Sequence, residues 1–157
     1  MVRRDPVALV GLLVVVVLVG AGPLTGVDVT SVQASTVGDG NATVTSVSVD
    51  TSALAVTDGR FGTNVSYFRI PPATVTVESV TGRPQLVYLV SVPGLNVDRT
   101  ETRVVTRDGT YRLDPDDRAL SSAAAPGEYN VTVSLRIQSF ETDRDLTRAN
   151  ATVEVAA

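Results

Sequence analysis

The residues best suited to chemistry in this chain are three aspartates that lie close together, Asp114, Asp116 and Asp117. Carboxylate oxygens are the ligands that calcium prefers, but this run lacks the spacing and the distal Glu of an EF-hand loop. An N-cap at Asp117 within a solvated acidic loop explains the same residues without a ligand. We therefore predict no dedicated metal site and no cofactor, and these three aspartates are the only metal-ligand candidates.

The residue types that are absent exclude most enzyme mechanisms. The chain contains no Cys, no His and no Lys, so it has no thiol nucleophile, no imidazole base and no Schiff-base amine. Two carboxylates can hydrolyse a glycoside, but nothing in the sequence places such a pair on one cleft wall. With 3 Phe, 4 Tyr and no Trp, the chain also has few rings to stack on sugars. We predict that the protein is not an enzyme.

The charged residues argue against nucleic acid as a partner. The net charge is -4, whereas contacts to phosphates need a basic patch. All 13 basic residues are Arg, and 12 Asp stand against 5 Glu. This composition is similar to that of haloarchaeal proteins.

Residues 1–24 are typical of a membrane-directed segment, either a signal peptide or an N-terminal transmembrane anchor. The pair Arg3-Arg4 precedes an uncharged run over 7–24, whose 18 residues lie between the length of a signal-peptide core and that of a spanning helix. Cleavage after Ala34, or an earlier cleavage within 20–22, would release the protein. Without cleavage the segment is a hydrophobic helix that anchors it, and the membrane becomes a partner. Both alternatives place the remainder outside the cytoplasm.

Glycosylation sequons also indicate an extracytoplasmic location. Four of the five asparagines begin an N-x-S/T triplet, where chance predicts about one, although Thr-rich strands also produce such triplets by accident. A glycan cannot point into a core, so each modified Asn must lie on a solvent-facing side of its strand. The candidate sites are Asn41, Asn64, Asn130 and Asn150.

Beyond the N-terminal segment the sequence predicts one linker and one domain. Residues 25–41 are rich in Gly, Ser, Thr and Asp, which is typical of a flexible linker. Over 42–157, β-branched residues dominate and no sustained helical periodicity occurs. We expect seven or eight antiparallel strands, at 43–50, 64–70, 73–80, 86–92, 101–107, 110–113, 129–137 and 150–155.

In two of these strands the sequence indicates which face is buried. In 129–137 and in 150–155, apolar residues alternate with polar ones, which predicts one buried and one solvent-facing side. Asn130 and Asn150 fall on the polar side of their strands. The alternation in 43–50 changes phase near Ser46, which predicts a bulge.

The sequence also predicts the form of three connections between strands. Asp108-Gly109 predicts a type I′ hairpin between its flanking strands, because that turn needs positive φ at its centre. Within 114–127, Asp117 is expected to cap one helical turn that runs to Ala125 and ends at Pro126-Gly127. Asp143-Arg144-Asp145 is expected to be a solvated loop tip before the last strand.

The segment Pro126-Gly127-Glu128-Tyr129-Asn130-Val131 resembles the tyrosine corner of immunoglobulin-like domains. The resemblance implies an antiparallel β-sandwich in which the Tyr129 phenol hydrogen-bonds back to the preceding loop. Val131 stands where antibody domains place a Cys, and the chain has no core Trp. The sequence is therefore more similar to disulfide-free relatives of the fibronectin-III, PKD or CARDB type.

These observations predict an exported, non-enzymatic, immunoglobulin-like module at the cell surface. Its expected role is structural or in protein interaction, with other cell-surface proteins as partners. The alternative is a module that binds a cation or a small solute through the loop that carries Asp114, Asp116 and Asp117.

Overall fold

The computed structural model describes residues 36–59, 65–121 and 124–156. The predicted signal peptide or anchor, most of the predicted linker and Asn64 lie outside the described residues. The chain divides into two compact units, Met1–Ala34 and Ser35–Ala157, and every described residue belongs to the second. No helix among the described residues is long and apolar enough to cross a membrane.

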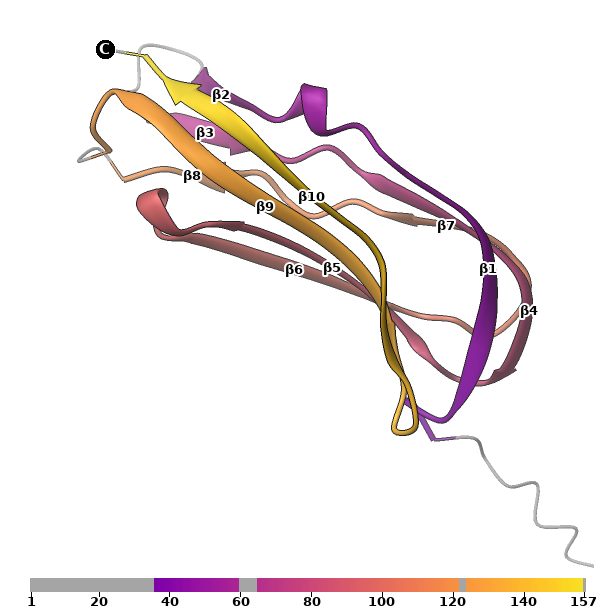
Figure 1. Ribbon diagram of the computed structural model, residues 1–157. Coiled ribbons are helices and arrows are strands. Elements are labelled where there is room, and N and C mark those ends of the chain that lie inside the picture. The colour runs from indigo at the N-terminus through magenta and orange to yellow at the C-terminus, as the bar shows by residue number, and fades with distance from the viewer. Residues whose placement is uncertain (1–35, 60–64, 122–123, 157) are drawn as a thin grey trace, which may run out of the picture. The chain divides into compact units, whose positions relative to one another are not determined.

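The described residues form an all-β structure of antiparallel sheets, consistent with a β-sandwich (Figure 1). One layer is a single sheet with the strand order β10-β9-β5-β6, called the four-stranded sheet below. The short 3-10 helix η2 (Pro93–Leu95) joins two of its strands. Its strands are β5 (Gln85–Val92), β6 (Val97–Val104), β9 (Gly127–Gln138) and β10 (Asp143–Val155).

The other layer consists of two three-stranded sheets with matching orders, β1-β4-β7 and β2-β3-β8. Along the chain β1 leads into β2, β3 into β4 and β7 into β8, so we call the two sheets together the interrupted layer. The 3-10 helix η1 (Thr51–Ala53) interrupts the first of these pairs. The strands are β1 (Gly40–Val49), β2 (Ala55–Asp58), β3 (Ser66–Arg69), β4 (Ala73–Gly82), β7 (Gly109–Leu113) and β8 (Arg118–Ala119).

A single hydrophobic core holds these strands together. Ten of its 21 buried apolar residues are Val, because β-branched side chains pack well on a pleated surface. The predicted alternation of β9 is confirmed on its apolar side, since Val131, Val133, Leu135 and Ile137 are buried. Ser134, predicted to face solvent, is buried as well, because β9 is a central strand between β10 and β5. The phase change near Ser46 is also confirmed, because the pairing of β1 with β4 shifts register between Val44 and Ser46.

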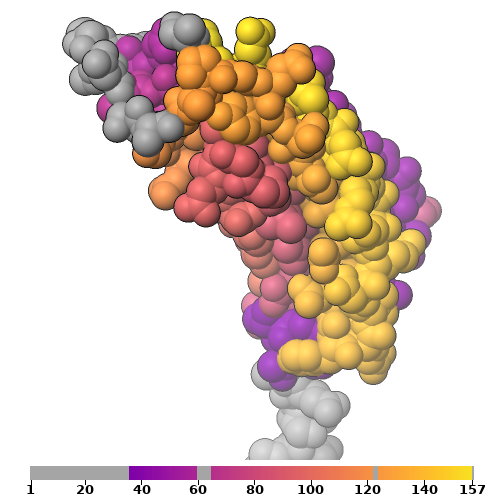
Figure 2. Space-filling model, turned by 60° about the vertical axis from the view of Figure 1, so that its left-hand side comes forward, coloured from indigo at the N-terminus to yellow at the C-terminus, as the bar shows by residue number. Residues whose placement is uncertain are grey.

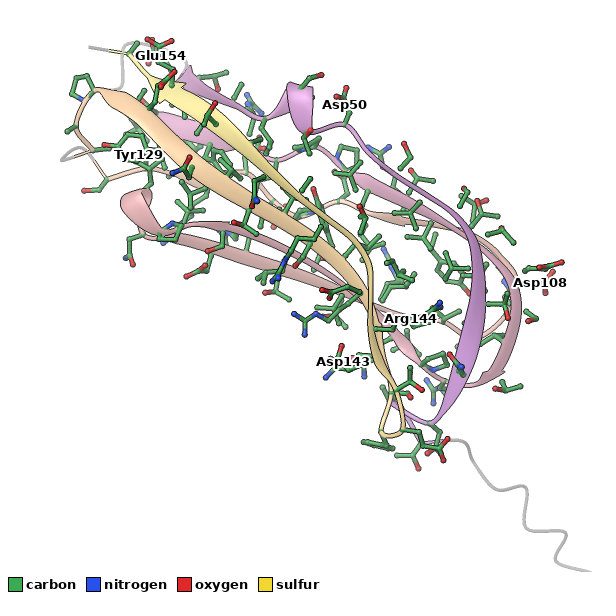
Figure 3. All side chains as sticks on the ribbon, viewed as in Figure 1. Asp50, Asp108, Tyr129, Asp143, Arg144 and Glu154 are labelled. Carbon is green, nitrogen blue, oxygen red and sulfur yellow. The ribbon has the colours of Figure 1, made fainter. Side chains whose placement is uncertain are left out.

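The predicted hairpin at Asp108-Gly109 is wrong. Strand β6 pairs with β5 and β7 pairs with β4, so the connection crosses from one layer to the other. Val105 is fully buried and its N–H donates to the Pro84 carbonyl at 2.8 Å, so the chain stays beside the start of β5 for one more residue before it crosses. Gly109 does have positive φ, at 135°, but it opens β7 after the crossing. Figure 3 shows Asp108 at the outer edge of the interrupted layer.

Two further connections also differ from the prediction. The helical turn expected after Asp117 is absent from the described part of 114–127, because Arg118 and Ala119 pair with β3 as β8. The tip between β9 and β10 consists of 139–142, because β10 already begins at Asp143. Asp143 and Asp145 lie on that strand, 3.3 and 3.9 Å from the Arg136 guanidinium, and Figure 3 shows Asp143 and Arg144 beside the strands, above the turn.

Tyr88 connects the two layers through the core. Its side chain is fully buried on β5, and its hydroxyl donates to the Pro71 carbonyl at 2.9 Å. Burial disfavours the phenolate and raises the pKa of Tyr88 to about 12. Pro71 lies between β3 and β4, so this hydrogen bond reaches the interruption of the opposite layer.

We expect Tyr88→Phe to lower the free energy of unfolding by about 1–3 kcal/mol at neutral pH, because the Pro71 carbonyl loses its donor. The raised pKa adds a pH dependence: its stabilisation is complete below about pH 10 and is lost as the pH rises toward about 12. Urea unfolding across this range measures both effects. Tyr67→Phe, at a half-exposed phenol, is the control and should retain the alkaline loss. A Tyr88→Phe protein with wild-type stability at neutral pH would contradict the assignment.

Candidate functional site

The three candidate aspartates are not gathered around one point. The Asp117 carboxylate accepts a hydrogen bond from the Ile70 N–H at 3.2 Å and forms an ion pair with Arg69. The Asp114 carboxylate lies 3.2 Å from the Arg112 guanidinium, and both side chains are largely exposed. Among the described residues, no group of three or more His, Cys, Asp or Glu side chains is arranged to hold a metal ion.

Asp117 compensates for a break in the middle strand of the interrupted layer. Pro71 and Pro72 follow β3 after one residue, Ile70, and proline has no N–H to donate to a sheet ladder. Strand β8 begins at Arg118, directly after Asp117. Arg118 pairs with Phe68, so the pairing of β8 with β3 does not extend to Ile70. The Asp117 side chain therefore supplies the acceptor for the Ile70 N–H at this point. Its role is a structural hydrogen bond between two strands.

We expect Asp117→Ala to lower the free energy of unfolding by about 1–3 kcal/mol, because the partly buried Ile70 N–H loses its acceptor. The matched control Asp114→Ala removes an exposed ion pair and should change it by less than about 0.5 kcal/mol. Asp117→Asn keeps an acceptor oxygen, so its loss of unfolding free energy should lie between the losses of the other two variants. Denaturant titration compares the three variants. Equal losses for Asp117→Ala and Asp114→Ala would contradict this role.

The sequons on β9 and β10 lie opposite each other in register. Asn150 pairs with Thr132, and Asn130 pairs with Thr152, so each sequon Asn faces the Thr of the other sequon. All of these side chains point to the same side of the four-stranded sheet, because cross-strand partners share a face. Figure 2 shows β9 and β10 running side by side along the surface. The sequence predicted the polar face but not this reciprocal pairing.

The sequon amides of the described residues are accessible. Asn41, Asn130 and Asn150 are all exposed. Thr132 Oγ1 donates to Asn150 Oδ1 at 3.1 Å, a contact that uses the amide oxygen and not Nδ2, the atom to which an N-linked glycan is attached. Diagonal neighbours on antiparallel strands are about 7–8 Å apart, so glycans on Asn130 and Asn150 would be close neighbours on one face.

Tyr129 has the geometry that the tyrosine-corner resemblance implied. Its hydroxyl donates to the Ala125 carbonyl, four residues earlier, at 2.7 Å. The ring also packs on Gly94 of η2, where a Cβ atom would lie 2.7 Å from Tyr129 Cδ1. Figure 3 shows Tyr129 at the start of β9. The corner thus connects the β9 entry to the turn between β5 and β6.

A second tyrosine with the same geometry was missed. The Tyr111 hydroxyl donates to the Arg107 carbonyl, again four residues earlier, at 2.7 Å. Both tyrosines stand two residues after a glycine with positive φ, Gly109 at 135° and Gly127 at 151°. The recurrence of Gly-x-Tyr at the start of two strands was the signal that could have found it.

Comparison with known proteins gives no match to a family model, to a curated protein or to a solved structure. The function of this chain must therefore be inferred from its own geometry. Its distinctive features are the structural aspartate, the reciprocal sequons and the two tyrosine corners.

We expect Gly94→Ala to lower the free energy of unfolding by about 1–3 kcal/mol, because the new methyl group would overlap the Tyr129 ring. In a Tyr129→Ala background the ring is absent and Gly94→Ala should be nearly neutral. A double-mutant cycle by thermal or denaturant unfolding measures this coupling. Additive losses would show that Gly94 and Tyr129 do not act as a unit.

Proposed function

We propose that this chain is an exported cell-surface protein whose immunoglobulin-like domain has a structural or protein-interaction role and catalyses no reaction. The observation that carries the proposal is the exposure of all three described sequon asparagines. Two of them form the reciprocal pair on the outer side of the four-stranded sheet. An exported domain can carry glycans at these positions without disturbing its core.

Two features support an immunoglobulin-like type of sandwich. The order β1-β4-β7 against β10-β9-β5-β6 matches two antiparallel sheets connected by strands that cross between layers. Tyr129 at the start of β9, bonded to the Ala125 carbonyl, matches the tyrosine corner of that class. The absence of Cys, and so of any disulfide, favours the fibronectin-III, PKD or CARDB type, and the Arg-rich, Lys-free composition favours a haloarchaeal source.

The interactions of the acidic loop favour this role over a cation- or solute-binding module. Asp117 is held by Arg69 and the Ile70 N–H, and Asp114 by Arg112. A cation at this loop would have to displace two guanidinium groups. The proposed partners are other cell-surface proteins, and the membrane where the N-terminal segment is retained.

Peptide mapping by mass spectrometry after expression in an N-glycosylating host tests the proposal. We expect glycans on sequon asparagines, and each Asn→Gln variant at Asn41, Asn130 or Asn150 should remove one site. The internal control is Asn96, which begins no sequon and should remain unmodified. Fractionation and N-terminal sequencing complete the test, since an N-terminus at Ser35 indicates release. An unmodified protein in the cytoplasm would contradict the proposal.

A further inference from the structure

The tip between β9 and β10 exposes a large apolar side chain. Phe140 is 73% exposed, and Val37, beside it, is 37% exposed. They are two of the three exposed large hydrophobic residues in the described part of the chain. Together with Gly38, Gln85, Gln138 and Ser139 they line a shallow pocket of about 220 Å³. We call Val37 and Phe140 the apolar tip.

The tip is built to hold Phe140 in place. Ser139 N–H donates to the Thr142 carbonyl at 2.6 Å, and Ser139 Oγ accepts from the N–H groups of Glu141 and Thr142 at 3.3 and 3.0 Å. The Phe140 N–H donates to the Gly38 carbonyl at 2.7 Å. Phe140 is therefore presented to solvent by a hydrogen-bonded turn that is fastened to the first residues of the domain.

Gly38 is adapted to this contact. Its φ is +99°, a conformation that other residues rarely adopt. A Cβ atom at Gly38 would lie 3.0 Å from Phe140 Cζ, tighter than ordinary van der Waals contact. The absence of a side chain thus allows the ring to rest on the Gly38 backbone, while most of its surface remains exposed.

The apolar tip lies at the end of the domain where the chain enters. Thr36 and Val37 directly precede Gly38, which is bonded to Phe140, and Figure 2 shows the first described residues next to the β9–β10 tip. Between the apolar N-terminal run and Thr36 lie residues 25–35. A chain of this length spans at most about 40 Å even when fully extended, so a membrane-held N-terminus limits the distance between the tip and the bilayer to that length.

We propose that the apolar tip contacts the lipid surface of the membrane that holds the N-terminal segment. This inference rests on the anchored form of the proposed function. A single aromatic ring binds lipid weakly, but the tether raises its effective concentration at the surface. Phe140 inserts at the boundary between headgroups and acyl chains, as amphipathic and aromatic groups do at membranes.

The charges around the tip indicate an apolar contact and not an electrostatic one. Asp39 and Glu141 lie near the two apolar residues in sequence, and Arg83 is bonded through its backbone to Gly38 and Asp39. Charges of both signs therefore lie beside the tip, and their field is screened at high ionic strength. Contact with zwitterionic lipid is therefore expected to persist when salt is added.

The chain contains no Trp, so Phe140→Trp creates a single fluorescent reporter. The full-length variant is reconstituted into phosphatidylcholine vesicles with or without brominated phosphatidylcholine, which quenches indole on contact. We expect the emission to fall about twofold in brominated vesicles, as for an interfacial indole. Val37→Trp should be quenched in the same way. The control Tyr67→Trp, in β3 at the opposite end of the domain (Figure 1), should not be quenched.

Vesicle flotation separates this inference from the proposed function. Flotation with quenching of the Phe140→Trp and Val37→Trp variants, but not of Tyr67→Trp, supports the contact. Flotation without quenching at the tip overturns the contact and leaves the anchor intact, and equal quenching of all three variants overturns it as well. If the protein does not float, the N-terminal segment does not tether it to the membrane. This result would overturn both the inference and the anchored form of the proposed function. A concentration-dependent shift of the Phe140→Trp emission without vesicles would overturn it by assigning the tip to a protein partner instead.

Discussion

The structure depends on how two consecutive prolines are accommodated in the middle strand of a sheet layer. Pro71 and Pro72 offer no N–H, so the ladder between neighbouring strands breaks at this level. The Asp117 carboxylate accepts the Ile70 N–H from one neighbouring strand, and the Tyr88 hydroxyl donates to the Pro71 carbonyl from the opposite layer. The β3–β4 connection is thus joined both within its own layer and across the core. The chain achieves this without a disulfide.

This arrangement determines which residues remain for function. The acidic run contributes Asp117 to the strand break and Asp114 to a surface pair with Arg112, so two of its three carboxylates are used within the domain, and Asp116 is exposed. The outer side of the four-stranded sheet carries the reciprocal sequons, and the end where the chain enters carries the apolar tip. The proposed glycans on the outer strands and the proposed lipid contact at one end are compatible with the proposed structural or protein-interaction role.

Local patterns predicted most of the strands, but they missed β2 and β8 and the first seven residues of β10, and they could not predict the strand partners. The apolar side of β9 and the phase change near Ser46 depend on neighbouring residues, and both were correct. The Asp108-Gly109 hairpin failed because β6 pairs with β5 and β7 pairs with β4 in the other layer, and no local signal reports these partners. The helical turn at Asp117 failed because its carboxylate binds an amide 47 residues away in sequence. The sequence could not show that the two sequons face each other, because the register of two strands depends on how they pair.

We propose that the acidic loop stabilises the fold and does not bind a ligand. Hydrogen exchange at the Ile70 amide, followed by NMR with and without millimolar calcium, tests it most directly. If Asp117 replaces the missing ladder partner, this amide is protected as strongly as those within the sheets in the absence of any cation, and calcium leaves its exchange unchanged. An Ile70 amide that exchanges freely until calcium is added would contradict the account.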